Sequence, residues 1–153
     1  MSVPALRLAR EDDIPQIEKL LAAEWLPPRM IREFLPTFWV LEDGDDVAGC
    51  AGLEIYGNTG VIRSVVVAPD LRGRGLGDLL SREAMGEAQR QGVRRLYLFT
   101  GDKVPFWQRY GFQECAMEDW EPDARASWQW QVMNERPEIR AMVTPMRLIP
   151  PGA

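Results

Sequence analysis

One stretch of the chain, residues 61–91, restricts the possible folds more than any other part of the sequence. It opens with a β-branched run over 61–67, which favours a strand. A proline at position 69 ends this run, and Arg-Gly-Arg-Gly-Leu-Gly follows over 72–77. We therefore predict a strand, a glycine-rich loop and a helix over 76–91 with one apolar stripe, made of Leu76, Leu79, Leu80, Ala84 and Ala88.

The glycines of this loop favour a binding site for a diphosphate. Glycine lets backbone N–H groups turn toward one point without a Cβ in the way, and the start of the helix adds positive potential. Arg72 and Arg74 could add charge-assisted contacts. The spacing differs from the dinucleotide pattern G-x-G-x-x-G, and the lysine of a P-loop is missing. The alternative is a tight strand-to-helix turn that binds no ligand.

The composition excludes several kinds of catalytic site. The chain has 153 residues and no histidine, which rules out Ser-His and Cys-His nucleophiles and histidine zinc sites. Cys50 and Cys115 are too few for a four-cysteine site, so we expect no metal and two buried thiols. The net charge of −5 argues against a nucleic-acid partner. Three arginines against one acid between 63 and 74 still permit a local anion site.

The size of the chain predicts a single domain over 1–153, and the lack of a membrane span and of a signal peptide predicts a cytoplasmic location. The longest uncharged apolar run, near 47–53, is too short to cross a bilayer, so no membrane partner is expected. The N-terminus lacks the pattern of a signal peptide.

We expect a core over 5–117 and a tryptophan-rich tail over 118–153. The tail tryptophans either cover an acceptor or anchor a core or a homodimer: Trp120, Trp128 and Trp130.

Local patterns predict the remaining elements. Strands are expected at 5–8, 38–42, 47–55, 93–100, 112–117 and 141–148, with a hairpin turn, Asp-Gly-Asp-Asp, at 43–46. Helices are expected at about 11–25, 29–35 and 104–110 and, in part, over 122–133. Gly92 is suited to end the long helix.

Two segments resemble the GCN5-related N-acetyltransferases (the GNAT family). Val-Val-Val-Ala-Pro-Asp-Leu-Arg-Gly-Arg-Gly-Leu-Gly, over 65–77, is similar to their acetyl-CoA signature, and Arg72, Gly75 and Gly77 meet its pattern [R/Q]-x-x-G-x-[G/A]. Phe-Trp-Gln-Arg-Tyr-Gly-Phe, over 106–112, is similar to the ending F-Y-x-x-x-G-F. The resemblance implies an α/β (α+β) fold. It would have a mixed, mostly antiparallel sheet of six to seven strands, splayed between strands four and five, and about four flanking helices.

The resemblance also implies acetyl-CoA as the co-substrate. The pantetheine arm would bond to backbone groups of Val65 and Val67, and the N–H of Val67 could polarise the thioester carbonyl. The pyrophosphate would lie on residues 72–78. The cofactor contacts implied are Val65, Val66, Val67, Arg72, Gly73, Arg74, Gly75, Leu76, Gly77, Asp78 and Trp107.

Two positions depart from the family pattern. Trp107 stands where many relatives carry a tyrosine that protonates the departing thiolate; Tyr110 is a candidate replacement, and a packed core aromatic is the alternative. Val61 stands where many relatives carry a glutamate. Glu54, on the preceding strand, is then the candidate general base, and a structural ion pair with Arg63 is the alternative.

The segments 49–51, 62–65 and 96–100 resemble N-acetylglutamate synthases and amino-acid acetyltransferases of the arsinothricin type. That resemblance implies a small-molecule acceptor, an amino acid or analogue, whose primary amine attacks directly in a ternary complex. Arg63 is the candidate cation for its carboxylate, with Ser64 and Thr100 as further substrate contacts. The alternative functions are acetylation of a protein or peptide, and a non-catalytic acyl-CoA-binding module.

Overall fold

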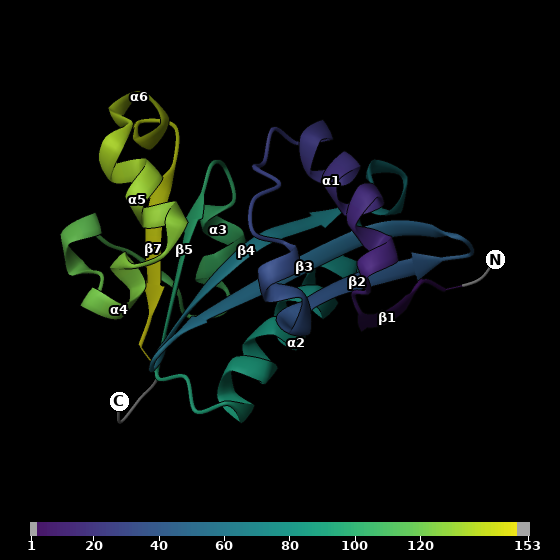
Figure 1. The fold of residues 1–153 in the computed structure, drawn as a ribbon, viewed down its shortest axis with the longest axis horizontal. Coiled ribbons are helices and arrows are strands. Elements are labelled where there is room, and N and C mark those ends of the chain that lie inside the picture. Colours follow the sequence, from purple (N-terminus) through teal and green to yellow (C-terminus); the bar gives the residue numbers. More distant parts are fainter. Residues whose placement is uncertain (1–2, 150–153) are drawn as a thin grey trace. The chain divides into compact units, whose positions relative to one another are not determined.

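The computed structural model describes residues 3–149 of the chain (Figure 1). Seven strands form one mixed sheet in the order β1-β2-β3-β4-β5-β7-β6. Pairing is antiparallel at β1–β2, β2–β3, β5–β7 and β6–β7 and parallel at β4–β5, so the predicted mixed, mostly antiparallel sheet is confirmed. The strands are β1 (Ala5–Leu8), β2 (Phe38–Asp43), β3 (Asp46–Tyr56), β4 (Thr59–Val67), β5 (Arg95–Thr100), β6 (Gln113–Glu114) and β7 (Thr144–Leu148).

The chain divides into two compact units. The first holds the residues up to 53 together with 63–87, and the second holds 54–62 and the residues from 88 onward. In the first unit β2 and β3 form the predicted hairpin, whose turn has Gly44 at φ +63°. Helix α1 (Ile14–Ala23) buries its apolar face in the core of this unit. That core contains Ile14, Ile17, Leu21, Phe38, Val40, Cys50 and Val66.

Helix α1 stops two residues earlier than expected, at Ala23. The N–H of Trp25 bonds to the carbonyl of Ala22, and the N–H of Leu26 bonds to that of Leu21 at 2.9 Å. This pair of bonds is a Schellman motif, in which Trp25 takes the left-handed position at φ +58°. The segment predicted as a helix over 29–35 is a 3₁₀ helix, Arg32–Thr37, that includes Pro36.

Helix α2 (Leu76–Arg90) confirms the longest predicted helix. Gly92, at φ +75°, ends it as expected, and the N–H of Val93 bonds back to the carbonyl of Ala88. The predicted stripe is correct except at Leu79, which is 41 % exposed. The remaining stripe residues are buried: Leu76, Leu80, Ala84 and Ala88.

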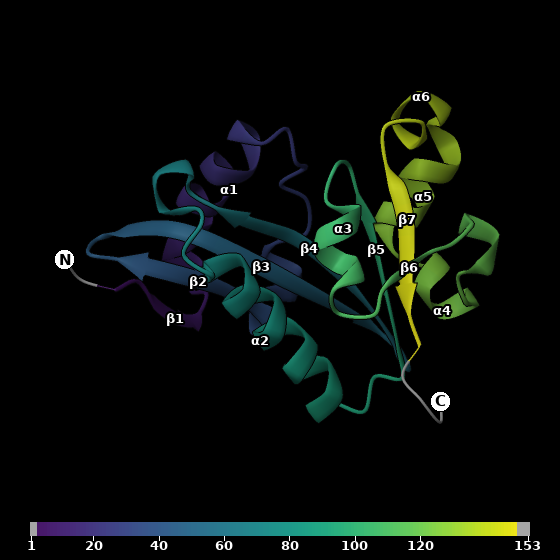
Figure 2. The ribbon, with the colours of Figure 1, turned by 180° about the vertical axis from the view of Figure 1, so that it is seen from behind.

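In the second unit the beginning of β4 pairs with β5 from Thr59↔Arg95 to Val61↔Tyr97. Strand β5 then pairs with β7, and β7 with β6, as Figure 2 shows from behind. The ring of Trp120 lies 4.6 Å from that of Phe99 and 4.7 Å from that of Tyr97, centroid to centroid. Trp120 is therefore a core anchor of this unit.

The tail beyond residue 117 has more helix than the sequence predicted. It forms α4 (Pro122–Arg125), α5 (Trp128–Glu135) and α6 (Pro137–Arg140). With α3 (Val104–Gln108), the described residues contain six α-helices where about four were expected. The run predicted over 122–133 is interrupted at Ser127, which is extended and whose Oγ caps the N–H of Trp130 at 3.3 Å.

Other boundaries also differ from the sequence predictions, since β4 begins at Thr59 rather than 61 and β5 at Arg95 rather than 93. Helix α3 ends at Gln108 rather than 110, because a Schellman motif closes it with Gly111 at φ +96°. The strand predicted over 112–117 is reduced to β6, since Asp119 accepts from the N–H of Ala116 and turns the chain into a 3₁₀ helix. Strand β7 begins at Thr144 rather than 141, after a turn in which the side chain of Arg140 donates to the carbonyl of Val143.

Candidate functional site

The glycine-rich loop of the first unit is exposed and depends on left-handed glycines. Gly73 and Gly75 have φ of +80° and +78°. A Cβ built at either position would meet nothing within 4 Å. Space beside the loop is therefore open, and only the backbone conformation makes glycine favourable at these positions.

Helix α2 begins directly after this loop. Its first intrahelical bond runs from the N–H of Leu79 to the carbonyl of Gly75, at 3.0 Å. The N–H groups of Leu76, Gly77 and Asp78 precede that bond, so the helix itself offers them no acceptor. Together with the helix dipole, such groups favour a bound anion.

Arg72 ties the loop to two other parts of the first unit. Its Nε donates to the carbonyl of Val67, the last residue of β4, at 3.0 Å. Its Nη2 forms an ion pair with Glu24, just after α1. The predicted phosphate ligand is thus held beside an acid that the sequence did not connect to it.

Strand β4 carries the residues predicted to contact the pantetheine arm. Val66 is buried, whereas Val65 and Val67 are half-buried. Ser64 has φ of +59°, a conformation that is uncommon for residues other than glycine and interrupts the regular strand. The thiol of Cys50 donates a hydrogen bond to the carbonyl of Ser64 at 3.2 Å, and burial raises the pKa of that thiol to about 12. Cys50 is therefore a neutral buried group, as predicted, whereas Cys115, also expected to be buried, is half-buried.

Arg63, the predicted ligand of an acceptor carboxylate, has contacts within the first unit that the sequence did not indicate. Its Nη2 donates to the carbonyl of Pro27 at 3.2 Å, and its Nη1 donates to that of Arg29. Its Nε donates to Oγ of Ser64 at 2.8 Å. The guanidinium of Arg63 therefore fixes the segment that follows α1, and its contact with substrate stays a prediction.

Glu54, the candidate base, lies in the second unit and is fully buried at 0 % exposure. One carboxylate oxygen accepts from the hydroxyl of Tyr56. The other accepts from the indole Nε1 of Trp128 at 2.9 Å. The sequence singled out Glu54 but not these two donors, because the contact with Trp128 joins residues 74 positions apart. The presence of an acid in an apolar strand was the available signal.

The other predicted residues of the second unit lie on β5 and near α3. Oγ1 of Thr100, a buried residue, accepts from the N–H of Lys103 at 3.1 Å. Trp107 is buried against Phe112, with ring centroids 5.5 Å apart. Tyr110 lies beyond the end of α3 and packs 5.4 Å from Phe106. These contacts match the packed-aromatic alternative for Tyr110 and leave its proposed role as an acid untested.

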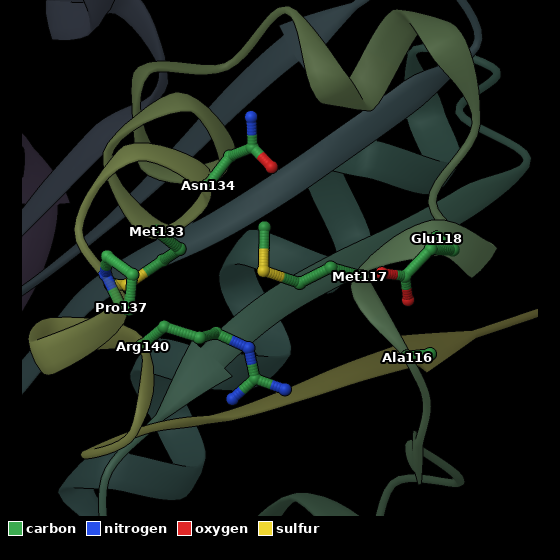
Figure 3. Close-up of a pocket in the computed structure, with 7 residues that line it drawn as sticks. All are labelled: Ala116, Met117, Glu118, Met133, Asn134, Pro137 and Arg140. Atoms are coloured by element: carbon green, nitrogen blue, oxygen red, sulfur yellow. The ribbon is translucent and has the colours of Figure 1, made fainter.

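A hollow of about 270 Å³ lies in the second unit between the 3₁₀ helix Met117–Asp119 and α5 and α6 (Figure 3). The side chain of Met117 enters it from one side, and those of Met133, Pro137 and Arg140 enter it from the other. None of the predicted site residues lines it.

Within residues 3–149 no group of three histidine, cysteine, aspartate or glutamate residues is placed to hold a metal ion. The same residues contain no helix that is both long and apolar enough to cross a membrane.

Comparison with known proteins gives the glycine-rich loop a context. The family model for an acetyltransferase (GNAT) domain matches residues 35–114, which include β3, β4, the loop and α2. The chain belongs to the GNAT acetyltransferase family.

Curated GNAT relatives include two proteins named amino-acid acetyltransferase. The one from Ralstonia nicotianae is 31 % identical over 135 residues, which are 82 % of this chain and 30 % of that protein. The one from Mycobacterium tuberculosis is 31 % identical over 121 residues, which are 72 % of this chain and 69 % of that protein. The chain thus spans less than a third of the length of the Ralstonia relative.

The GNAT fold is also found in solved structures. A Mycobacterium tuberculosis protein crystallised in complex with CoA has a TM-score of 0.79 and 23 % sequence identity, over 96 % of this chain and 99 % of that one. At this identity the likeness shows a shared fold.

Proposed function

We propose that this GNAT protein transfers an acetyl group from acetyl-CoA to the primary amine of a small amino acid or amino-acid analogue. One observation carries the proposal: an exposed loop with two left-handed glycines leads into α2, directly after β4. Such a loop suits the pyrophosphate of CoA, since it combines backbone donors with a helix N-terminus.

Residues of the first unit would hold the donor. The backbone of residues 72–78 would bind the pyrophosphate, and the guanidinium of Arg72 would exchange Glu24 for a phosphate oxygen. Exposed Arg74 adds a second positive charge beside the loop. Backbone groups of Val65 and Val67 would bind the pantetheine arm, and Val66 and Leu76 would contribute apolar contacts.

The reaction requires a neutral amine and a stabilised oxyanion. Glu54 would accept a proton from the acceptor ammonium, after which the nitrogen attacks the thioester carbonyl carbon. The N–H of Val67 would stabilise the negative charge that develops on the carbonyl oxygen. The C–S bond then breaks. One of the two protons left on the nitrogen goes to the departing thiolate, directly or through Tyr110, and the other stays on the amide product.

An amino acid as acceptor is supported by relatives named amino-acid acetyltransferase, among them those from Ralstonia nicotianae and Mycobacterium tuberculosis. Arg63, Ser64 and Thr100 remain proposed substrate contacts. For Arg63 this role requires that the acceptor carboxylate join or replace the contacts of the guanidinium with Pro27, Arg29 and Ser64.

Thiol release from acetyl-CoA tests the proposal. The purified protein is assayed with the standard L-amino acids, with their α-carboxamides and with a set of peptides. We expect turnover that depends on a free amino acid, and mass spectrometry should find the product one acetyl group heavier. Turnover with peptides alone would favour a protein acetyltransferase. Binding of acetyl-CoA without any acceptor-dependent turnover would favour a non-catalytic module, and no binding at millimolar acetyl-CoA would refute the loop assignment.

A further inference from the structure

Gln129 is a buried amide whose side chain no other described residue satisfies. Its side chain is 7 % exposed, and within the described residues neither Oε1 nor Nε2 has a hydrogen-bond partner. Ser81 and Trp120 each leave one buried side-chain atom unpaired, whereas Gln129 leaves both of its polar atoms unpaired. Buried polar groups are nearly always hydrogen-bonded, so this position calls for an explanation.

The local structure gives no reason for a glutamine here. Gln129 is the second residue of α5, where methionine and leucine have a similar helix propensity. An apolar side chain of similar size would fill the same space and avoid the desolvation of an unpaired amide. The unpaired polar atoms therefore destabilise the fold, and hydrogen bonds to a ligand would offset this loss.

The neighbours of Gln129 in the chain connect it to the candidate base. Trp128, the preceding residue, donates its indole N–H to Glu54 at 2.9 Å. Ser127 caps the same turn by accepting from the N–H of Trp130. The first turn of α5 is thus fixed at both sides of Gln129, and the amide is presented from a rigid backbone.

We propose that Gln129 binds the acceptor amino acid and selects for its free α-carboxylate. The inference rests on the proposed function and extends it to acceptor recognition. An amide offers two N–H donors and one carbonyl acceptor. The donors suit the carboxylate of an amino acid, and the carbonyl oxygen suits its ammonium. Glu54 supplies the negative charge that complements the ammonium, so the two residues together match a zwitterion.

Gln129→Met tests the proposal, with Gln131→Met as the matched control. Gln131 lies on the same helix but is exposed, and its Nε2 donates to the carbonyl of Arg125 at 2.8 Å. For Gln129→Met we expect the KM for the amino acid to rise about 10- to 100-fold, because a hydrogen bond to a charged group is lost. The KM for acetyl-CoA should not change, and the melting temperature should stay the same or rise. Gln131→Met should leave both KM values unchanged.

The opposite result identifies a purely structural glutamine. If Gln129→Met raises the melting temperature and leaves the acceptor KM unchanged, the inference is wrong while the acetyltransferase function stands. Gln129→Glu provides a second variant. Its added negative charge should weaken the binding of amino acids more than the binding of their α-carboxamides. Equal effects on both would also overturn the inference. Calorimetry with amino acids and their α-carboxamides, in the absence of acetyl-CoA, measures the same difference in affinity without turnover. A failure of the proposed catalysis is therefore distinguishable from a failure of the proposed recognition by Gln129.

Discussion

The indole Nε1 of Trp128 donates a hydrogen bond to Oε2 of Glu54 at 2.9 Å and connects the tail to strand β3. Trp128 lies outside the segment 35–114 that matches the family model. A fully buried carboxylate needs donors of this kind, because the charged form loses its hydration. The tail therefore fixes the orientation of the candidate base in the second unit, together with the hydroxyl of Tyr56.

Replacing Trp128 by Phe is expected to lower the free energy of unfolding by about 2 kcal/mol, because a ring remains but a donor to a buried carboxylate is lost. Trp130→Phe is the matched control on the same helix. It removes an indole bond of 3.1 Å to the neutral carbonyl of Met117 and should cost about 1 kcal/mol. Urea unfolding measures both, and equal losses would contradict a special role for the contact with Glu54.

Replacing Glu54 by Gln should reduce turnover about 100-fold, because the amide cannot accept the proton of the ammonium. Calorimetry should find an unchanged affinity for acetyl-CoA. Glu114→Gln, at an exposed position on β6, controls for the loss of one charge. Turnover like that of the wild type would remove Glu54 from the mechanism.

Replacing Gly75 by Val should abolish acetyl-CoA binding in a protein that still folds. A β-branched residue disfavours φ of +78°, at a cost of about 1–2 kcal/mol, although no atom blocks its Cβ. Gly92→Val is the matched control, since Gly92 has φ of +75° and an equally open Cβ position at the other end of α2. Calorimetry with acetyl-CoA should separate the two variants. The loop assignment fails if both bind equally well.

Replacing Glu24 by Gln should raise the affinity for acetyl-CoA about two- to fivefold. The substitution frees Arg72 from a partly exposed ion pair worth about 0.2–1 kcal/mol and removes a negative charge near the proposed phosphate site. Glu18→Gln makes the same charge change at an exposed position on α1. The difference between the variants should shrink in high salt. An affinity that does not rise would indicate that Arg72 does not bind the phosphates.

Replacing Asp13 by Asn should cost about 2 kcal/mol of unfolding free energy at pH 7 and less near pH 3. Hydrogen bonds from Arg7 at 2.7 and 2.9 Å, and one from the N–H of Arg10, hold the pKa of Asp13 below its ordinary value against the effect of burial. A carboxyl with a lowered folded pKa stabilises the protein above its unfolded pKa, and this stability is lost as the pH falls through the folded pKa.

Urea titrations at both pH values measure this dependence. Asp12→Asn, at an exposed position of the same 3₁₀ turn, should change the stability by less than about 0.5 kcal/mol. A cost for Asp13→Asn that is the same at both pH values would show that the contacts of the ionised carboxylate are not its origin.

Local patterns predicted those features whose physical cause is itself local. The hairpin at Gly44, the helix α2 and its end at Gly92 follow from backbone preferences that act over a few residues. Helix ends were missed where a side chain of ordinary type took an unusual backbone conformation, as at Trp25. Leu79 was assigned to the buried stripe because periodicity alone does not fix the width of a buried face.

The sequence by itself determined the strand, loop and helix of the proposed cofactor site, because glycines, arginines and a helix start act on the backbone within about ten residues. Only the tertiary structure decided which distant groups meet. It placed the carbonyls of Pro27 and Arg29 on the guanidinium of Arg63, and the indole of Trp128 on Glu54. Such contacts depend on how whole elements pack, and a side-chain hydrogen bond between distant residues leaves no periodic signal in the chain.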